Sequence, residues 1–120
     1  MKNNVIPVLR IFDFAKTEEF YINWLGFTID WQHRFGDNFP LYLQISKGDI
    51  LLHLSEHHGD CCPGGKVFIN YKGLKEYHQE LINKDYRYNK PGLGDAPWNA
   101  LCMEVIDPVG NKLLFNENKD

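Results

Sequence analysis

The sequence predicts an α+β fold built from two βαβββ modules. The first observation is a repeat: one apolar strand, one helix and three further strands follow each other twice, with a period of about 60 residues. The second is a pair of turn sequences, Lys-Gly-Asp at 47–49 and Asp-Pro-Val-Gly-Asn at 107–111, each set between short apolar runs. A supersecondary unit used twice buries its apolar face against its copy. We therefore expect one domain over residues 1–120, with modules at about 1–58 and about 65–118.

The first module is predicted to contain a strand, a helix and three strands, at residues 5–11, 13–25, 28–35, 41–46 and 50–55. Asp13 carries the carboxylate expected of a helix N-cap. Phe20 and Trp24 have the i, i+4 spacing of one helix face, and Gly26 is a usual C-terminal stop.

The second module is predicted to repeat this order, at residues 67–71, 73–83, 86–89, 100–106 and 112–116. Leu74, Tyr77 and Leu81 form the apolar stripe of its helix, which begins near Gly73. The two turn sequences then join the last two strands of each module as hairpins.

The net charge and the hydropathy of the sequence argue against nucleic-acid and membrane partners. A net charge of −3 and a pI near 5.9 argue against nucleic acid, which needs a basic footprint, and favour a neutral or cationic ligand. No apolar run reaches the roughly 20 residues that span a bilayer, and the N-terminus leads directly into a strand. We expect a cytoplasmic protein with no membrane partner. The cysteines are odd in number, and Cys61 and Cys62 are adjacent, so all are expected to be free thiols.

Several motifs in this order resemble the vicinal oxygen chelate superfamily: the paired modules, Leu-Gly-Phe at 25–27, Pro-Trp at 97–98 and Asp-Pro-x-Gly-Asn at the last hairpin. This superfamily includes glyoxalases, dioxygenases and bleomycin resistance proteins, and the chain is most similar to the last of these, over residues 6–115. The resemblance implies a homodimer with ligand crevices at its interface, strand-swapped in some members.

Metal chemistry can be tested on the sequence. In the enzymes of this superfamily, the resemblance implies a divalent ion held by His and Glu side chains from strands of both modules. The corresponding positions fall at or near Ile6, His53, Gly65 and Leu114, of which only His53 can bind a metal. One histidine does not make a site, so we expect neither a metal nor another cofactor.

The densest group of potential ligands begins at His53 and continues through Glu56 and His57 to Cys61 and Cys62. Strand alternation points His53 and Glu56 to opposite faces unless the strand has already ended. Two interpretations stay open: a metal-dependent lyase or dioxygenase that uses His53 with Glu56 or His57, and a half-buried His53 followed by a solvated loop.

Aromatic side chains placed for binding are the other signal. Trp31, His33 and Phe35 alternate along one predicted strand and so share a face, from which planar rings can stack on heteroaromatic rings or cations. The alternative is that Trp31, Phe35 and Trp98 are core residues. The resemblance assigns ligand contact to aromatic and acidic residues, and the predicted ligand-binding set is Asp30, Trp31, Phe35, Phe39, Tyr42, His53, Ser55, Trp98 and Cys102.

Two residues depart from the drug-binding pattern. Asn99 stands where glycine is common, and Cys102 stands where many relatives have an acidic residue that would help to capture a cationic drug. The sequence thus predicts a metal-free binding protein, rather than an enzyme, that sequesters a bleomycin-type or other aromatic or cationic drug and so gives antibiotic resistance. The alternatives are the metal-dependent enzyme and a structural or regulatory dimer with no small ligand.

Overall fold

Both modules have the predicted order of strand, helix and three strands in a computed structural model, which describes residues 3–34 and 36–120. The elements of the first module are β1 (Val8–Arg10), α1 (Phe14–Thr17), η1 (Glu18–Trp24), β2 (Thr28–Arg34), β3 (Leu41–Lys47) and β4 (Ile50–Ser55). Those of the second are β5 (Lys66–Asn70), α2 (Leu74–Asn83), β6 (Gly94–Ala96), β7 (Ala100–Ile106) and β8 (Lys112–Asn118).

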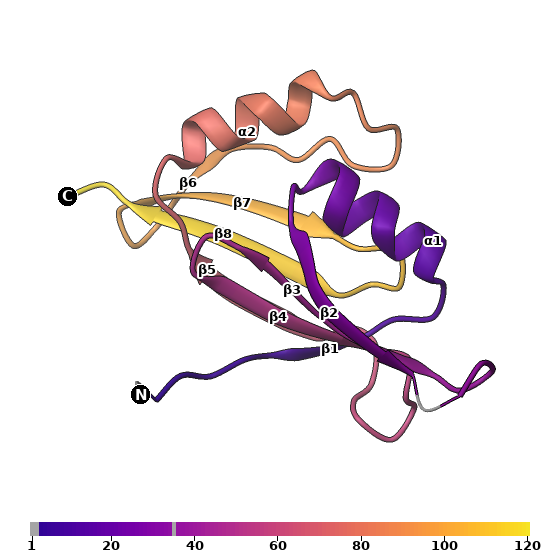
Figure 1. Cartoon of the computed structure of the whole chain (residues 1–120). Coiled ribbons are helices and arrows are strands. Elements are labelled where there is room, and N and C mark those ends of the chain that lie inside the picture. The colour runs from indigo at the N-terminus through magenta and orange to yellow at the C-terminus, as the bar shows by residue number, and fades with distance from the viewer. Residues whose placement is uncertain (1–2, 35) are drawn as a thin grey trace.

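Each module makes one four-stranded sheet. The first sheet has the order β1-β4-β3-β2 and the second has the order β5-β8-β7-β6. In each, the first strand of the module pairs in parallel with the last, and the other pairs are antiparallel. The identical order confirms that one unit is used twice, and Figure 1 shows the helices lying over the same side of the two sheets.

The first helix begins as predicted, because the Asp13 carboxylate accepts a hydrogen bond from Lys16 N at 3.3 Å. It continues as η1, a π-helical segment in which Leu25 N donates to Phe20 O at 2.9 Å. Gly26, with a φ of 87°, follows the end of this helix in the left-handed conformation that glycine adopts without strain.

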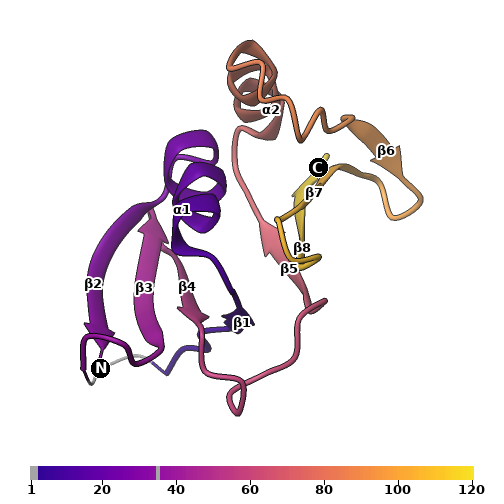
Figure 2. The same ribbon diagram turned by 90° about the vertical axis from the view of Figure 1, so that its right-hand side faces the viewer.

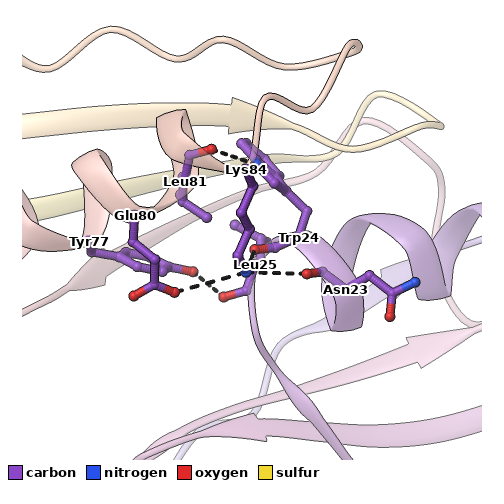
Figure 3. Close-up of polar contacts among 7 residues, drawn as sticks. All are labelled: Asn23, Trp24, Leu25, Tyr77, Glu80, Leu81 and Lys84. Carbon is purple, nitrogen blue, oxygen red and sulfur yellow. Dashed lines mark hydrogen bonds and ion pairs between the residues drawn. The ribbon is translucent and has the colours of Figure 1, made fainter.

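The two modules join through their helices, as Figure 3 shows. Trp24 Nε1 donates to Leu81 O at 3.2 Å, and Tyr77 Oη donates to Leu25 O at 2.5 Å. Lys84 Nζ adds a hydrogen bond to Trp24 O at 2.6 Å. Since the helix-facing residues of both sheets enter the same apolar cluster, the chain has one shared core.

The Asp-Pro-x-Gly-Asn turn at 107–111 connects the two modules by hydrogen bonds. Asp107 Oδ2 accepts from Tyr21 Oη at 2.8 Å, and burial followed by the Asp107 charge raises the pKa of Tyr21, which keeps this phenol a donor. Asn111 Nδ2 donates to Arg10 O at 2.7 Å, while its Oδ1 accepts from Gly65 N at 3.1 Å. The motif therefore ties the first helix, β1 and the inter-module linker together.

The strand predicted at 86–89 is wrong. Asp85 has a φ of 51°, and a turn follows in which Asn89 N donates to Tyr86 O at 3.2 Å. The Tyr86 ring packs on Trp24 at 5.1 Å between centroids, so its apolar contact is with the first helix. The edge strand of the second sheet is instead β6, which pairs with β7.

Candidate functional site

Each sheet has one face packed into the core and an open face that the helices of the described chain leave uncovered. Figure 2 shows the two sheets as separate layers. We name the residues on the first open face the Trp31 half-site, which consists of Asp30, Trp31, Tyr42, Gln44 and His53. Those on the second form the Trp98 half-site, which consists of Phe68, Trp98, Cys102 and Asn116. Predicted ligand residues thus come together, but in two groups on two sheets.

A chain of hydrogen bonds organises the Trp31 half-site. Asp30 Oδ2 accepts from Gln44 Nε2 at 3.1 Å, which turns Gln44 Oε1 toward His53 Nε2 at 2.9 Å. Since Gln44 Oε1 is only an acceptor, His53 carries its hydrogen on Nε2, and its Nδ1 accepts from Tyr42 Oη at 2.7 Å. Burial lowers the pKa of His53, which agrees with this neutral tautomer.

Rings surround this chain of hydrogen bonds. Trp31 stacks on Tyr42 with centroids 6.0 Å apart and planes 12° apart, and it meets His53 edge-on at 5.3 Å. Trp31 is 43% exposed, so it is not a core residue. The ladder between β2 and β3 shifts register between Ile29 and Trp31, and this bulge lets Asp30 and Trp31 both act on the open face although they are neighbours in sequence.

The second half-site is organised around Asn116, which is 2% exposed. Its Oδ1 accepts from Trp98 Nε1 at 2.7 Å and from Cys102 Sγ at 3.3 Å. Trp98 is itself 52% exposed and lies 6.4 Å from the Phe68 ring between centroids. Asn99 has a φ of 61°, which asparagine tolerates better than most residues, so the departure from glycine keeps the turn.

A divalent ion of the kind found in the related enzymes does not fit these residues. His53 uses both ring nitrogens for Tyr42 and Gln44, and the other inferred ligand positions, Ile6, Gly65 and Leu114, have no side-chain donor atom for a metal. Within residues 3–34 and 36–120, no three or more His, Cys, Asp or Glu side chains are grouped as metal ligands. These residues therefore do not support a metal-dependent reaction at this site.

The alternative metal group is also dispersed. Glu56 Oε1 accepts from Leu41 N at 2.8 Å and lies 3.8 Å from Arg34 Nη1, away from His53. His57 N donates to Ser55 Oγ at 3.0 Å, which supports the loop that follows β4. β4 ends at Ser55, so Glu56 lies beyond the strand, and its contacts with Leu41 and Arg34, rather than strand alternation, hold it there.

The remaining predicted ligand residues have varied positions. Ser55 is fully buried and donates to Asp60 Oδ2 at 2.6 Å, so its hydroxyl anchors a loop and has no exposed surface. Phe39 is exposed but lies in the loop between β2 and β3, in a different groove from Trp31. Phe35 lies outside the described residues. Cys61 and Cys102 are free thiols, and burial raises the pKa of each.

Gln44 and Asn116 are the site residues that sequence reasoning missed. Gln44 stands between apolar residues of β3, and Asn116 directly follows the apolar run 113–115 of β8; these amides were the available signal. Amides in such positions need hydrogen-bond partners, and here those partners are the half-site side chains.

The Trp31 half-site opens into a groove of about 470 Å³ lined by Trp31, His33, Tyr42, His57 and Asp60. A larger groove of about 540 Å³ lies on the helical side, beside Phe20, Tyr86 and Tyr88. We place the candidate site at the smaller groove because Trp31 and Tyr42, two of the predicted ligand residues, line it, whereas no predicted ligand residue lines the larger one.

Comparisons with known proteins agree with this fold. A family model described as glyoxalase superfamily protein matches residues 1–120. Among solved structures, a bleomycin-binding protein complexed with bleomycin has a TM-score of 0.74 at 21% identity, over 98% of this chain and 100% of that one. A bleomycin resistance determinant encoded on the transposon Tn5 has a TM-score of 0.73 at 22% identity, over 99% and 100%.

A glyoxalase family protein from Bacillus anthracis, described as putative in its name, is also similar, with a TM-score of 0.70 at 20% identity over 99% of this chain and 100% of that one. No curated protein sequence matches. The chain belongs to the glyoxalase superfamily, and these structural likenesses confirm its fold. None of the described helices is long and apolar enough to cross a membrane.

Proposed function

We propose that this member of the glyoxalase superfamily is a metal-free binding protein that sequesters an aromatic or cationic drug of the bleomycin type. The observation that carries the proposal is the pair of exposed aromatic groups on the two open sheet faces. Trp31, Phe68 and Trp98 are 43%, 53% and 52% exposed, although the exposure of such large apolar side chains to water is unfavourable. Sequestration needs affinity and protein concentration but no bond making, so the protein would give antibiotic resistance by lowering the free drug.

The proposed crevice requires two copies of the chain. The two modules of one chain join through their helices, which leaves the Trp31 and Trp98 half-sites on separate sheets. If two chains pair by their open faces, the Trp31 half-site of one closes over the Trp98 half-site of the other. A two-fold pairing of this kind makes two equivalent crevices.

The two half-sites suit different parts of one ligand. Asp30 is an exposed carboxylate held by Gln44 and Ser46, while His53 stays neutral beside it, so this side favours a cationic group. The Trp98 half-site presents the Trp98 and Phe68 rings, and the charges nearest to it along the strands, Lys66 and Glu104, are paired with each other at 2.9 Å. This side favours a planar apolar portion of the ligand.

Bleomycin is the first ligand to test, because the names of two similar structures refer to it. Calorimetric titration of the purified protein should give saturable binding at one drug per chain. Sedimentation should give a dimer at micromolar concentration, twice the 14.0 kDa of one chain. A monomer would remove the two-chain crevice, and failure of bleomycin and of other aromatic cations to bind would remove the sequestration proposal.

Metal analysis of the same protein preparation distinguishes the enzyme alternative from the binding protein. A metal-dependent lyase or dioxygenase would need His53 to exchange its hydrogen bonds with Tyr42 and Gln44 for a metal bond, and it would need further ligands from elsewhere. One equivalent of a divalent metal per chain that survives dialysis against a chelator, and that is lost in His53→Ala, would favour the enzyme.

A further inference from the structure

Outside the two half-sites, Arg10 lies on β1 at the edge of the first sheet. Arg10 is 9% exposed, and its Nε is buried without a hydrogen-bond partner. Within residues 3–34 and 36–120, its guanidinium forms no ion pair. The guanidinium lies over the Phe12 ring, whose centroid is 4.5 Å from Arg10 Cζ. Buried guanidinium groups are normally paired, because an unpaired buried charge is strongly unfavourable.

Arg10 lines a groove of about 310 Å³ at the end of the first sheet, together with Phe12, Arg34, Phe39 and Glu56. Phe12 and Phe39 are each 55% exposed, so the groove has apolar walls beside its charged groups. Its volume is at the lower end of the roughly 300–1,000 Å³ of small-molecule sites, which limits the occupant to a small ligand.

The charges of this groove do not cancel. Arg34 Nη1 donates to Phe39 O at 2.7 Å and lies 3.8 Å from Glu56 Oε1, so Arg34 and Glu56 compensate each other. Glu56 is further committed to Leu41 N at 2.8 Å. Among the described residues, Arg10 thus has no ion-pair partner of its own, and its charge acts together with that of Asp60 on the Cys61 thiol.

We propose that this groove is a binding site for the carboxylate of a small aromatic acid. The carboxylate accepts from Arg10 Nη1 and Nη2, the end of the guanidinium that is not buried as Nε is, in a planar two-bond arrangement, and the aromatic ring lies between Phe12 and Phe39. The site goes beyond the proposed drug crevice and does not depend on it, since the crevice takes a cationic or neutral aromatic group at other residues.

A carboxylate can reach Arg10 from two sources, a free small molecule or an acidic residue of a second copy. The groove favours the small molecule, because Phe12 and Phe39 provide ring-sized apolar walls that a short acidic side chain would leave exposed. The experiment therefore includes a dilution series, which separates the two sources.

The test uses phenylacetate as the probe and phenylacetamide as its neutral counterpart. In the wild-type protein, phenylacetate should shift the Arg10 Nε–H resonance in a nitrogen-edited NMR spectrum and raise the thermal midpoint, whereas phenylacetamide should do neither. Arg10→Met should weaken phenylacetate binding by about tenfold or more, and Arg10→Lys by less, because lysine keeps the charge without the paired donors.

Arg87→Met is the matched control, because it removes the same charge from an arginine outside this groove, at Tyr88. It should bind phenylacetate as the wild type does. Arg10→Met should fold with an equal or higher midpoint, since it removes a buried unpaired charge. If it fails to fold, the Arg10 Nε–H shift in the wild type and the affinity of Arg10→Lys still decide the question.

Three results would overturn the proposal: equal phenylacetate affinity in Arg10→Met and Arg87→Met, no change of the Arg10 Nε–H resonance at saturating probe, or equal binding of phenylacetamide. A fourth is an Arg10 Nε–H resonance that shifts with protein dilution and not with phenylacetate. That result would assign the carboxylate to a second copy of the chain. None of these outcomes bears on bleomycin binding at the half-sites.

Discussion

Truncation of Trp98 to alanine should weaken drug binding while the fold remains intact. Trp98 is 52% exposed, so about 100 Å² of the roughly 200 Å² of a tryptophan remains for a ligand to cover. At about 25 cal/mol per Å², this area corresponds to about 2.5 kcal/mol. We expect Trp98→Ala to lose about 1 to 3 kcal/mol of binding free energy, as for a buried aromatic contact, which weakens the Kd by roughly 5- to 150-fold.

The cost to the free energy of unfolding should be smaller than for a core residue. Trp98→Ala removes half-buried contacts and the hydrogen bond from Nε1 to Asn116. We expect a loss of about 1 to 2 kcal/mol, below the roughly 3 to 5 kcal/mol of a fully buried aromatic residue. Trp24, which is 2% exposed, provides that comparison in the same chain.

Calorimetric titration with bleomycin and urea unfolding should be measured on Trp98→Ala, Trp31→Ala and Tyr88→Ala. Tyr88 is the control, because it is 66% exposed but lies in the groove on the helical side. The reasoning is refuted if Trp98→Ala and Trp31→Ala bind the drug as Tyr88→Ala does. It is also refuted if either tryptophan variant loses stability like a core substitution while its drug affinity stays unchanged.

Three further predictions concern the metal, a histidine and a helix cap. Elemental analysis of protein purified without an affinity tag should find no stoichiometric divalent metal after chelator dialysis; one equivalent that depends on His53 would contradict this. Burial lowers the pKa of His53 in the folded protein. The contribution of His53 to stability is therefore present above the unfolded pKa of about 6.5 and is lost as the pH falls toward the folded pKa. An NMR titration of the ring and acid unfolding of His53→Gln can check this. Glu117 accepts from Gly73 N and Leu74 N at 3.0 Å each, which lowers its pKa. Glu117→Ala should therefore cost about 1 kcal/mol in urea unfolding, and the wild-type contribution should disappear as the pH falls below about 4.3; an unchanged midpoint would show that the cap is dispensable.

Turn sequences and the periodicity of apolar residues predicted most of the fold, because most of its helices and strands follow these local patterns. Turn chemistry at 47–49 and 107–111 placed both hairpins, and alternation placed Trp31 and His33 on one face. The strand predicted at 86–89 failed because the apolar side of Tyr86 packs on the first helix, a contact between modules that no local pattern records. β6, which contains Gly94, has few side-chain signals for a strand.

The half-sites were predicted less completely than the fold. Exposure of Trp31 and Trp98 could not be derived from sequence, because a tryptophan on an alternating strand suits a core as well as a surface. The role of Gln44 depends on Asp30, which a register shift brings to the same face. Such a bulge depends on pairing with another strand, so it has no strict signature in the strand that contains it.

The two half-sites differ in what fixes their side chains, and this difference bears on selectivity. In the Trp31 half-site, the Asp30 charge orients Gln44, and Gln44 in turn fixes the tautomer of His53. In the Trp98 half-site, the neutral Asn116 amide holds Trp98. The first thus presents the exposed Asp30 carboxylate to a ligand, whereas the charged groups on the second face, Lys66 and Glu104, are paired with each other at 2.9 Å. A drug that fills both would be oriented with its cationic part toward Asp30 and its rings toward Trp98, because the reverse orientation would cover the Asp30 carboxylate without giving it a cationic partner.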